Sequence, residues 1–223
     1  MPHQHALIIF IDNSLKKENS KLAEEIGIEK TLAIQKILSQ ITQSITDQLL
    51  HTKIIFYSDY IDHNDAWNDN VYDKQLQQGK DMGERMKNAF EYAFNLESHP
   101  IQQACIIWGD VTELTLWHLT KSYYALNTHD CVLGPTNSGT YYLLGMKNVI
   151  HEVFQNKTWG NPNMIRSTCD EMHELRKSYY LLPHLSDINS IEHFTPQFSQ
   201  LLIDIGIISE TELINIKDRN SEQ

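Results

Sequence analysis

Short apolar runs alternate with longer segments of helical periodicity along most of the chain. The runs are rich in β-branched and aromatic residues and end at polar, glycine or proline positions, which predicts buried strands at 6–11, 53–57, 104–108, 130–133 and 141–144. Apolar residues spaced three and four apart predict helices around 34–49, 82–94 and 114–126. Capping signals predict further helices from 161 to about 177 and from 209 onward.

The order of these elements indicates the fold class. Strand and helix alternate from residue 6 to about residue 130, so we predict an α/β fold with a mainly parallel sheet and helices on both faces. The two runs at 130–133 and 141–144 follow each other closely, which predicts that the sheet is not wholly parallel there. Without repeats or low-complexity linkers, we expect a single domain over residues 1–217 and a frayed tail at 218–223. The apolar segment 201–208 is expected to pack on this domain or on another subunit of a homo-oligomer.

The composition excludes several classes of protein. Lys and Arg number 18 against 29 Asp and Glu, a formal charge of −11, which argues against nucleic-acid binding. No apolar run is long enough to span a membrane, and the first residues lack a basic signal-peptide region, so we expect a cytoplasmic protein. Cys105, Cys131 and Cys169 form no close pair. We predict that Cys105 and Cys131, which lie inside apolar runs, are reduced and buried.

Aspartates follow the first three predicted strands. In an open α/β sheet, ligands bind beyond the carboxyl ends of the strands, where Asp12, Asp59 and Asp110 would share one edge. Such carboxylates suit a hard divalent cation that also binds a substrate phosphate, although aspartates in these places also cap helices. Asp110 is the best single candidate because it directly follows a buried strand and Gly109. We predict that it lies in a concave pocket, near Asp12 and Ser138, at the end of the central strand 104–108.

The common phosphate-binding and nucleophile motifs are missing. The sequence has no glycine-rich phosphate loop, no Gly-x-Ser-x-Gly motif and no histidine cluster of metal-site spacing. Lys16, Lys17 and Lys21 could hold a phosphate by charge, and a solvated lysine face is the alternative.

Three segments together resemble a known family. They contain Gly83-Glu84-Arg85-Met86, Gly109-Asp110 and Gly134-Pro135 followed by Tyr141-Tyr142. In this order they resemble bacterial type-A glycosyltransferase-like proteins, the sugar-nucleotide transferases associated with radical-SAM enzymes and selenodomains. The similarity extends to about residue 194 and implies the three-layer sandwich of nucleotide-diphospho-sugar transferases.

The resemblance also implies a site and a mechanism. Mg²⁺ or Mn²⁺ held by Asp110 would neutralise the departing nucleoside diphosphate while a hydroxyl group of an acceptor attacks the sugar carbon. Asp12 and one of Lys16, Lys17 and Lys21 would lie at the diphosphate, and Ser138 and Gly139 at the ligand. Glu84 and Arg85 would line or brace the site, and a helix cap with a surface ion pair is the alternative for this pair.

Several departures from the family pattern fall on the ligand edge. Asp12 replaces a lysine, Ser138 and Asn189 replace aspartates, and Thr140 replaces a glycine. Two hypotheses follow: a glycosyl or nucleotidyl transferase with an altered active site, or a catalytically silent relative that acts as a ligand-binding or protein-interaction module. We predict weaker and less metal-dependent binding of sugar nucleotides than the intact motifs would give, and tight metal-dependent binding would argue against the silent relative.

Overall fold

A seven-stranded sheet forms the body of the molecule in the computed structural model, which describes residues 4–13 and 20–221. The strands are β1 (His5–Ile11), β2 (Thr52–Tyr57), β3 (Tyr72–Leu76), β4 (Gln103–Trp108), β5 (Cys131–Pro135), β6 (Tyr141–Met146) and β7 (Tyr179–Leu181). The helices are α1 (Lys21–Ile26), α2 (Ile28–Thr46), α3 (Met82–Phe94), α4 (Leu116–Leu126), α5 (Met164–Glu174), α6 (Pro196–Asp204) and α7 (Glu210–Ser221), with 3₁₀ turns η2 (His151–Phe154) and η3 (Ile191–His193).

The strand order is β3-β2-β1-β4-β6-β5-β7, so the strand predicted at 104–108 is central, as expected. Phe10 of β1 pairs with Phe56 of β2 and with Trp108 of β4, all in parallel register. Among the described strands, β6 alone runs antiparallel to its neighbours β4 and β5. The predicted break in the parallel sheet is therefore confirmed.

Alternate residues of each central strand face two different apolar layers. Ile8 and Phe10 pack with α3 and α5, whereas Leu7 and Ile9 pack with α4 and the residues that follow α2. The central strands are consequently buried on both faces, which explains their unbroken apolar runs. This arrangement confirms the predicted α/β three-layer sandwich.

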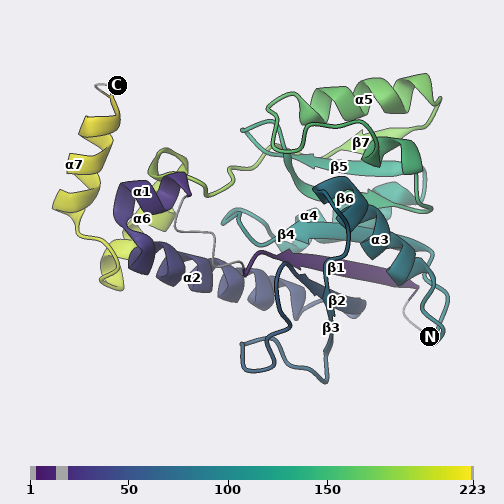
Figure 1. Ribbon diagram of the computed structural model, residues 1–223, viewed down its shortest axis with the longest axis horizontal. Coiled ribbons are helices and arrows are strands. Elements are labelled where there is room, and N and C mark those ends of the chain that lie inside the picture. The colour runs from purple at the N-terminus through teal and green to yellow at the C-terminus, as the bar shows by residue number, and fades with distance from the viewer. Residues whose placement is uncertain (1–3, 14–19, 222–223) are drawn as a thin grey trace.

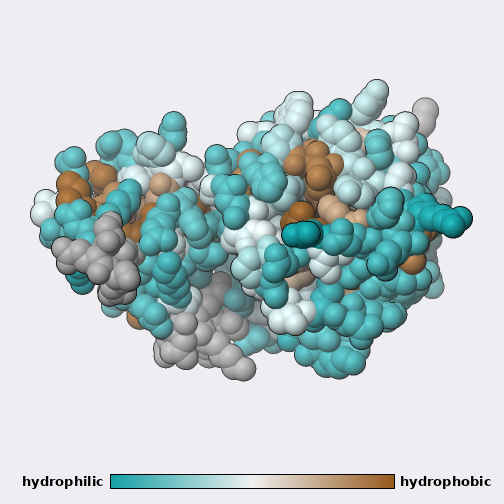
Figure 2. All heavy atoms as spheres, turned by 90° about the horizontal axis from the view of Figure 1, so that it is seen from above, coloured by the Kyte–Doolittle hydropathy of each residue, from teal (hydrophilic) through white to brown (hydrophobic). Residues whose placement is uncertain are grey.

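A separate helical cluster lies at one end of the molecule. It comprises α1, the N-terminal half of α2, η3, α6 and α7, and Figure 1 shows α2 running from this cluster to the sheet. Leu202 and Ile208 are buried there, so the apolar segment 201–208 packs on its own chain, one of the two predicted outcomes. Leu201 and Ile205 face solvent, and Figure 2 shows apolar surface at this end.

Several elements differ from the sequence prediction. The strands β3 and β7 and the helices α1 and α6 were not predicted, and α2 begins at Ile28 rather than near residue 34. α7 continues to Ser221, so residues 218–221, expected to form a tail, are helical. None of the helices in the described ranges combines the length and apolar character needed to cross a membrane.

The cysteine prediction is confirmed. Cys105 and Cys131 are fully buried in adjacent parts of the sheet, and both thiols are free. Burial raises the pKa of the Cys105 thiol to about 12 and raises that of Cys131 further. Both thiols therefore stay protonated and unreactive in the folded protein.

Candidate functional site

A cavity of about 690 Å³ lies between the carboxyl ends of β1, β2 and β4 and the helix α2. Its walls come from the end of β1, from α1 and α2, from the loop after β2, from Gly109-Asp110 and from Ile188-Asn189. This is the edge at which open α/β sheets bind ligands, and the volume is in the range of small-molecule sites.

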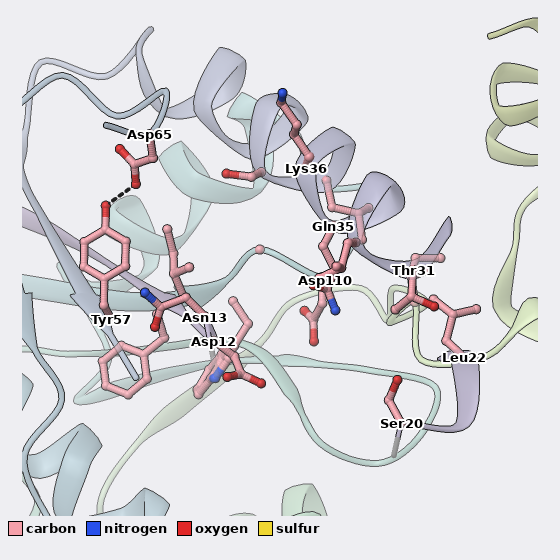
Figure 3. Close-up of a pocket in the computed structure, with 18 of the residues that line it drawn as sticks. Asp12, Asn13, Ser20, Leu22, Thr31, Gln35, Lys36, Tyr57, Asp65 and Asp110 are labelled. Carbon is pink, nitrogen blue, oxygen red and sulfur yellow. Dashed lines mark hydrogen bonds between the residues drawn. The ribbon is translucent and has the colours of Figure 1, made fainter. Parts of the chain in front are cut away.

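Asp12 and Asp110 stand side by side in this cavity. Phe10 of β1 is paired with Trp108 of β4 in the sheet. Asp12 comes two residues after Phe10, and Asp110 comes two residues after Trp108. Figure 3 shows both carboxylates pointing into the same space. Ser58 Oγ donates a hydrogen bond to Asp12 Oδ1 at 3.0 Å, and Ile188 N–H donates to the Asp110 carbonyl at 2.7 Å. The predicted position of Asp110, in a concave pocket at the end of the central strand, is confirmed.

Asp59, the third aspartate expected at this edge, does not line the cavity. Its side chain is exposed, and its backbone N–H donates to Asn13 Oδ1 at 3.1 Å. The expected trio of carboxylates at the strand ends is therefore a pair, Asp12 and Asp110.

A hydrogen-bonded cluster next to Asp110 contains two of the replaced motif positions. Ser138 Oγ donates to Asp187 Oδ2 at 3.0 Å, and Asn189 Nδ2 donates to the same oxygen at 2.8 Å. Asp187 forms a short antiparallel bridge with Val111, so the cluster lies beside Asp110. Asn189 lines the cavity, whereas Ser138 reaches the cavity wall only through Asp187 and Asn189.

Asp187 is a carboxylate that we did not predict as part of the site. It is 7% exposed, and its Oδ1 has no hydrogen-bond partner among the described residues. The sequence signal was the segment Asp187-Ile-Asn189, in which the resemblance drew attention to the asparagine rather than to the aspartate.

Of the three predicted lysines, Lys21 is described and lies close to two acids. Lys21 lines the cavity, but its ammonium lies 3.9 Å from Glu25 and 3.5 Å from Glu192. Lys16 and Lys17 lie outside the described residues. The described carboxylates and ammonium groups of the cavity wall are four acids and two bases: Asp12, Asp62, Asp65, Asp110, Lys21 and Lys36. The described wall is therefore acidic.

Glu84 and Arg85 brace the start of α3 and do not line the cavity. Glu84 accepts the backbone N–H of Lys80 at 3.0 Å and pairs with its ammonium at 3.1 Å, and these two contacts lower the pKa of Glu84. Arg85 donates to the Gly79 carbonyl at 3.3 Å and to Gln77 Oε1 at 3.4 Å. These contacts are those of the helix-cap alternative, and a direct ligand contact by the pair stays a prediction.

Gly139 is a packing position at the turn between β5 and β6. Its φ is +87°, and a Cβ there would lie 1.8 Å from the carbonyl oxygen of Pro162. Its own carbonyl accepts the N–H of Ile165 at 3.1 Å. The chain itself thus fills the space beside Gly139, which does not line the cavity, and its role at a ligand stays a prediction.

The end of the cavity near β2 is aromatic and polar. The Tyr57 hydroxyl donates to Asp65 Oδ2, and Lys74 Nζ lies 2.9 Å from Asp65 Oδ1. Burial and the contact with Asp65 raise the pKa of Tyr57 well above its usual range, so the phenol stays protonated. The sequence pattern gave no signal for this group.

Solved structures with the same architecture define the class of fold. A candidate nucleotide-diphospho-sugar transferase from Desulfovibrio desulfuricans G20 is 20% identical, with a TM-score of 0.76 over 92% of this chain and 96% of that chain. 4-Diphosphocytidyl-2C-methyl-D-erythritol synthase from Anaerococcus prevotii is 10% identical (TM-score 0.53, 89% and 98% covered). A cytidylyltransferase from Leptospira borgpetersenii is 11% identical (TM-score 0.52, 99% and 96% covered). The chain therefore has the fold of nucleotidyl and sugar-nucleotide transferases.

The family assignment is more specific than the fold. Residues 41–161 match the uncharacterized proteins conserved in bacteria that form the family DUF2064, and this chain belongs to that family. No curated protein matches the sequence.

Proposed function

We propose that the protein binds a nucleoside-diphosphate sugar in the cavity and transfers the glycosyl or nucleotidyl group to an acceptor, in the manner of the radical-SAM-associated transferases that its motifs resemble. The observation that supports this proposal is the pair Asp12 and Asp110, which share the cavity at the ends of two central parallel strands. The relation to solved transferase folds supports it at the level of architecture.

Each site group has a task in glycosyl transfer. The acceptor oxygen forms a bond to the anomeric carbon, and the bond from that carbon to the diphosphate oxygen breaks with its electron pair leaving on the nucleoside diphosphate. The proton of the acceptor hydroxyl passes to a base, for which the carboxylate of Asp12 is placed and which Ser58 orients. The second carboxylate, that of Asp110, would hold the cation that faces the departing group, and the Asp110 carbonyl accepts the N–H of Ile188.

The donor atoms fit a divalent cation that is shared with the substrate. Within the described residues, no three or more His, Cys, Asp and Glu side chains form a group that could hold a metal by themselves. Mg²⁺ commonly uses one or two protein carboxylates together with substrate phosphates, and Asp110 would supply one such carboxylate. The ion would supply positive charge to the leaving diphosphate.

The acidic wall supports the second hypothesis, a catalytically silent relative. A diphosphate carries negative charge, and the described wall carries four carboxylates against two lysines; Asp65 is paired with Lys74, and Lys21 lies near Glu25 and Glu192. Repulsion of this kind weakens anion binding unless a cation intervenes. The two hypotheses therefore differ in metal dependence.

Calorimetric titration with UDP- and GDP-sugars, with and without Mn²⁺, separates the hypotheses. If the proposal is right, binding requires the metal, and Asp110→Asn weakens it by about tenfold or more, or about 1.4 kcal/mol. Asp170→Asn, an exposed aspartate on α5, is the matched control and leaves the binding unchanged. Weak binding that is indifferent to metal and to Asp110→Asn favours the silent relative, and absence of all nucleotide-sugar binding contradicts the proposed function.

A further inference from the structure

The cavity has two chemically different ends with the two carboxylates between them. Figure 3 shows Asp12 and Asp110 between Tyr57 and Asp65 on one side and Leu22 and Thr31 on the other. The second side, which we call the aliphatic end, is formed by the start of α2 and by the helical cluster. Its apolar lining residues are Leu22 and Ile188 from the core of the cluster and Ile28 and Leu32 from the first turns of α2. A transferase binds two substrates on either side of the reacting atoms. In this cavity, one end lies on each side of Asp12 and Asp110 and could hold one substrate.

The described residues at the aliphatic end present mainly carbon to the cavity. Leu32 of α2 lines the cavity and is 52% exposed, so it offers apolar surface to a ligand at this end. The Thr31 hydroxyl already donates to the Gly27 carbonyl at 3.0 Å, and Lys21 is held by Glu25 and Glu192. A sugar or a diphosphate placed here would lose hydration without gaining matching hydrogen bonds.

We infer that the aliphatic end receives the apolar part of the acceptor, with the acceptor's hydroxyl group lying at Asp12 and Asp110. The inference rests on the proposed function, because it assigns the second substrate of the same site. The donor nucleotide then occupies the opposite end, where the half-exposed Tyr60 offers an aromatic face and Asp62 offers hydrogen-bond acceptors. The acceptor class is an alcohol or glycoside with an aliphatic body.

A series of methyl, butyl and hexyl β-D-glucosides, used below their micellar concentrations, tests this assignment without nucleotide. Each methylene that enters an apolar site raises affinity by about fourfold, so the dissociation constant should fall steeply along the series. Leu32→Asn should flatten this dependence. Gln40→Asn, an exposed position on the same helix outside the cavity, is the matched control and should preserve it.

The outcomes distinguish this inference from the proposed function. A flat series for the unsubstituted protein, or a steep series that Leu32→Asn does not change, overturns the inference, because the chain is then not bound at this end. Titration of the same variants with UDP- and GDP-sugars tests the donor separately, and Leu32→Asn should leave that binding within about twofold. If the glucoside series is steep and no sugar nucleotide binds, the apolar site stands and the transferase proposal falls.

Discussion

Gly83 and Gly139 lie in the segments that resemble the transferase family. At each of them, atoms of neighbouring residues occupy the space that a Cβ would need. At Gly83 that place is 2.4 Å from the Phe154 carbonyl oxygen and 2.6 Å from the Trp159 ring. At Gly139 it is 1.8 Å from the carbonyl oxygen of Pro162. The lack of a side chain at both glycines therefore allows the segment 154–162 to pack closely against α3 and against the turn after β5. This packing gives a physical reason for motif residues that lie outside the cavity.

Gly139→Ala should lower the free energy of unfolding by about 3 kcal/mol or more, because a left-handed backbone and a backbone clash act together. The control is Gly206→Ala, at a φ of +76° with no atom within 4 Å of the added Cβ. Backbone strain alone should cost about 1 kcal/mol there. Urea unfolding measures both values, and equal losses would show that the contact with Pro162 has no energetic weight.

The sequence was sufficient to predict which side chains lie at the edge of the sheet. It was not sufficient to predict the contacts between segments that are far apart in the chain. Asp12 and Asp110 meet because parallel neighbours end at the same edge, which follows from where the apolar runs stop. Asp187 arrives through an isolated bridge to Val111, and no periodicity signals such a bridge. The pairing of Lys21 with Glu192 is likewise a contact between distant segments.

The segment between β2 and β3 is held by one buried cation. The Lys74 side chain is 3% exposed and lies 2.9 Å from Asp65 and 2.6 Å from Asp69. Its ammonium also donates to the Asp62 carbonyl at 2.7 Å. Since Asp62 and Asp65 line the cavity, this strand residue fixes one cavity wall.

Lys74→Met should destabilise the protein by about 3–5 kcal/mol, because it leaves the partly buried carboxylate of Asp65 without its cation. Lys87→Met removes a surface pair with Glu91 at 3.8 Å and should change stability by no more than about 0.5 kcal/mol. Thermal unfolding and limited proteolysis within 58–71 measure the two effects. A loop that resists protease equally in both variants would argue against this role of Lys74.

The strands and helices that the sequence analysis did not predict have only a weak hydrophobic periodicity. β3 reads Tyr-Asp-Lys-Gln-Leu, a mostly polar edge strand, and β7 has only three residues. α1 spans six residues after its Ser20 cap, too few for a helical periodicity to stand out. The buried central strands and the amphipathic helices α3 and α4 were predictable because burial on defined faces imposes a period on their sequences.

The helix α2 belongs to both parts of the molecule. Ile34 and Leu38 in its N-terminal half pack in the helical cluster, and Ile45 near its C-terminus packs against the sheet. A continuous helix of 19 residues is a stiff connection between the two parts. We therefore propose that the sheet and the helical cluster form one cooperative domain.

Unfolding followed by tryptophan fluorescence and by far-ultraviolet circular dichroism should show one coincident transition. The four tryptophans, Trp67, Trp108, Trp117 and Trp159, lie outside the helical cluster, whereas circular dichroism reports the helices of both parts. Leu202→Ala, in the core of the cluster, should shift both signals together by about 2–5 kcal/mol. A dichroism transition that separates from the fluorescence transition would show two independent units.

The helical cluster also has a consequence for the order in which a ribosome makes this protein. Its first contributors, Leu22 to Leu38, leave the ribosome long before their partners at 188–216, and about 150 residues separate the two groups. At ordinary rates of protein synthesis this interval is roughly 8–30 s. The apolar face of α1 and α2 is uncovered throughout that time, while the strands of the sheet are already available to pair. The nascent chain therefore exposes an apolar surface that the finished molecule conceals.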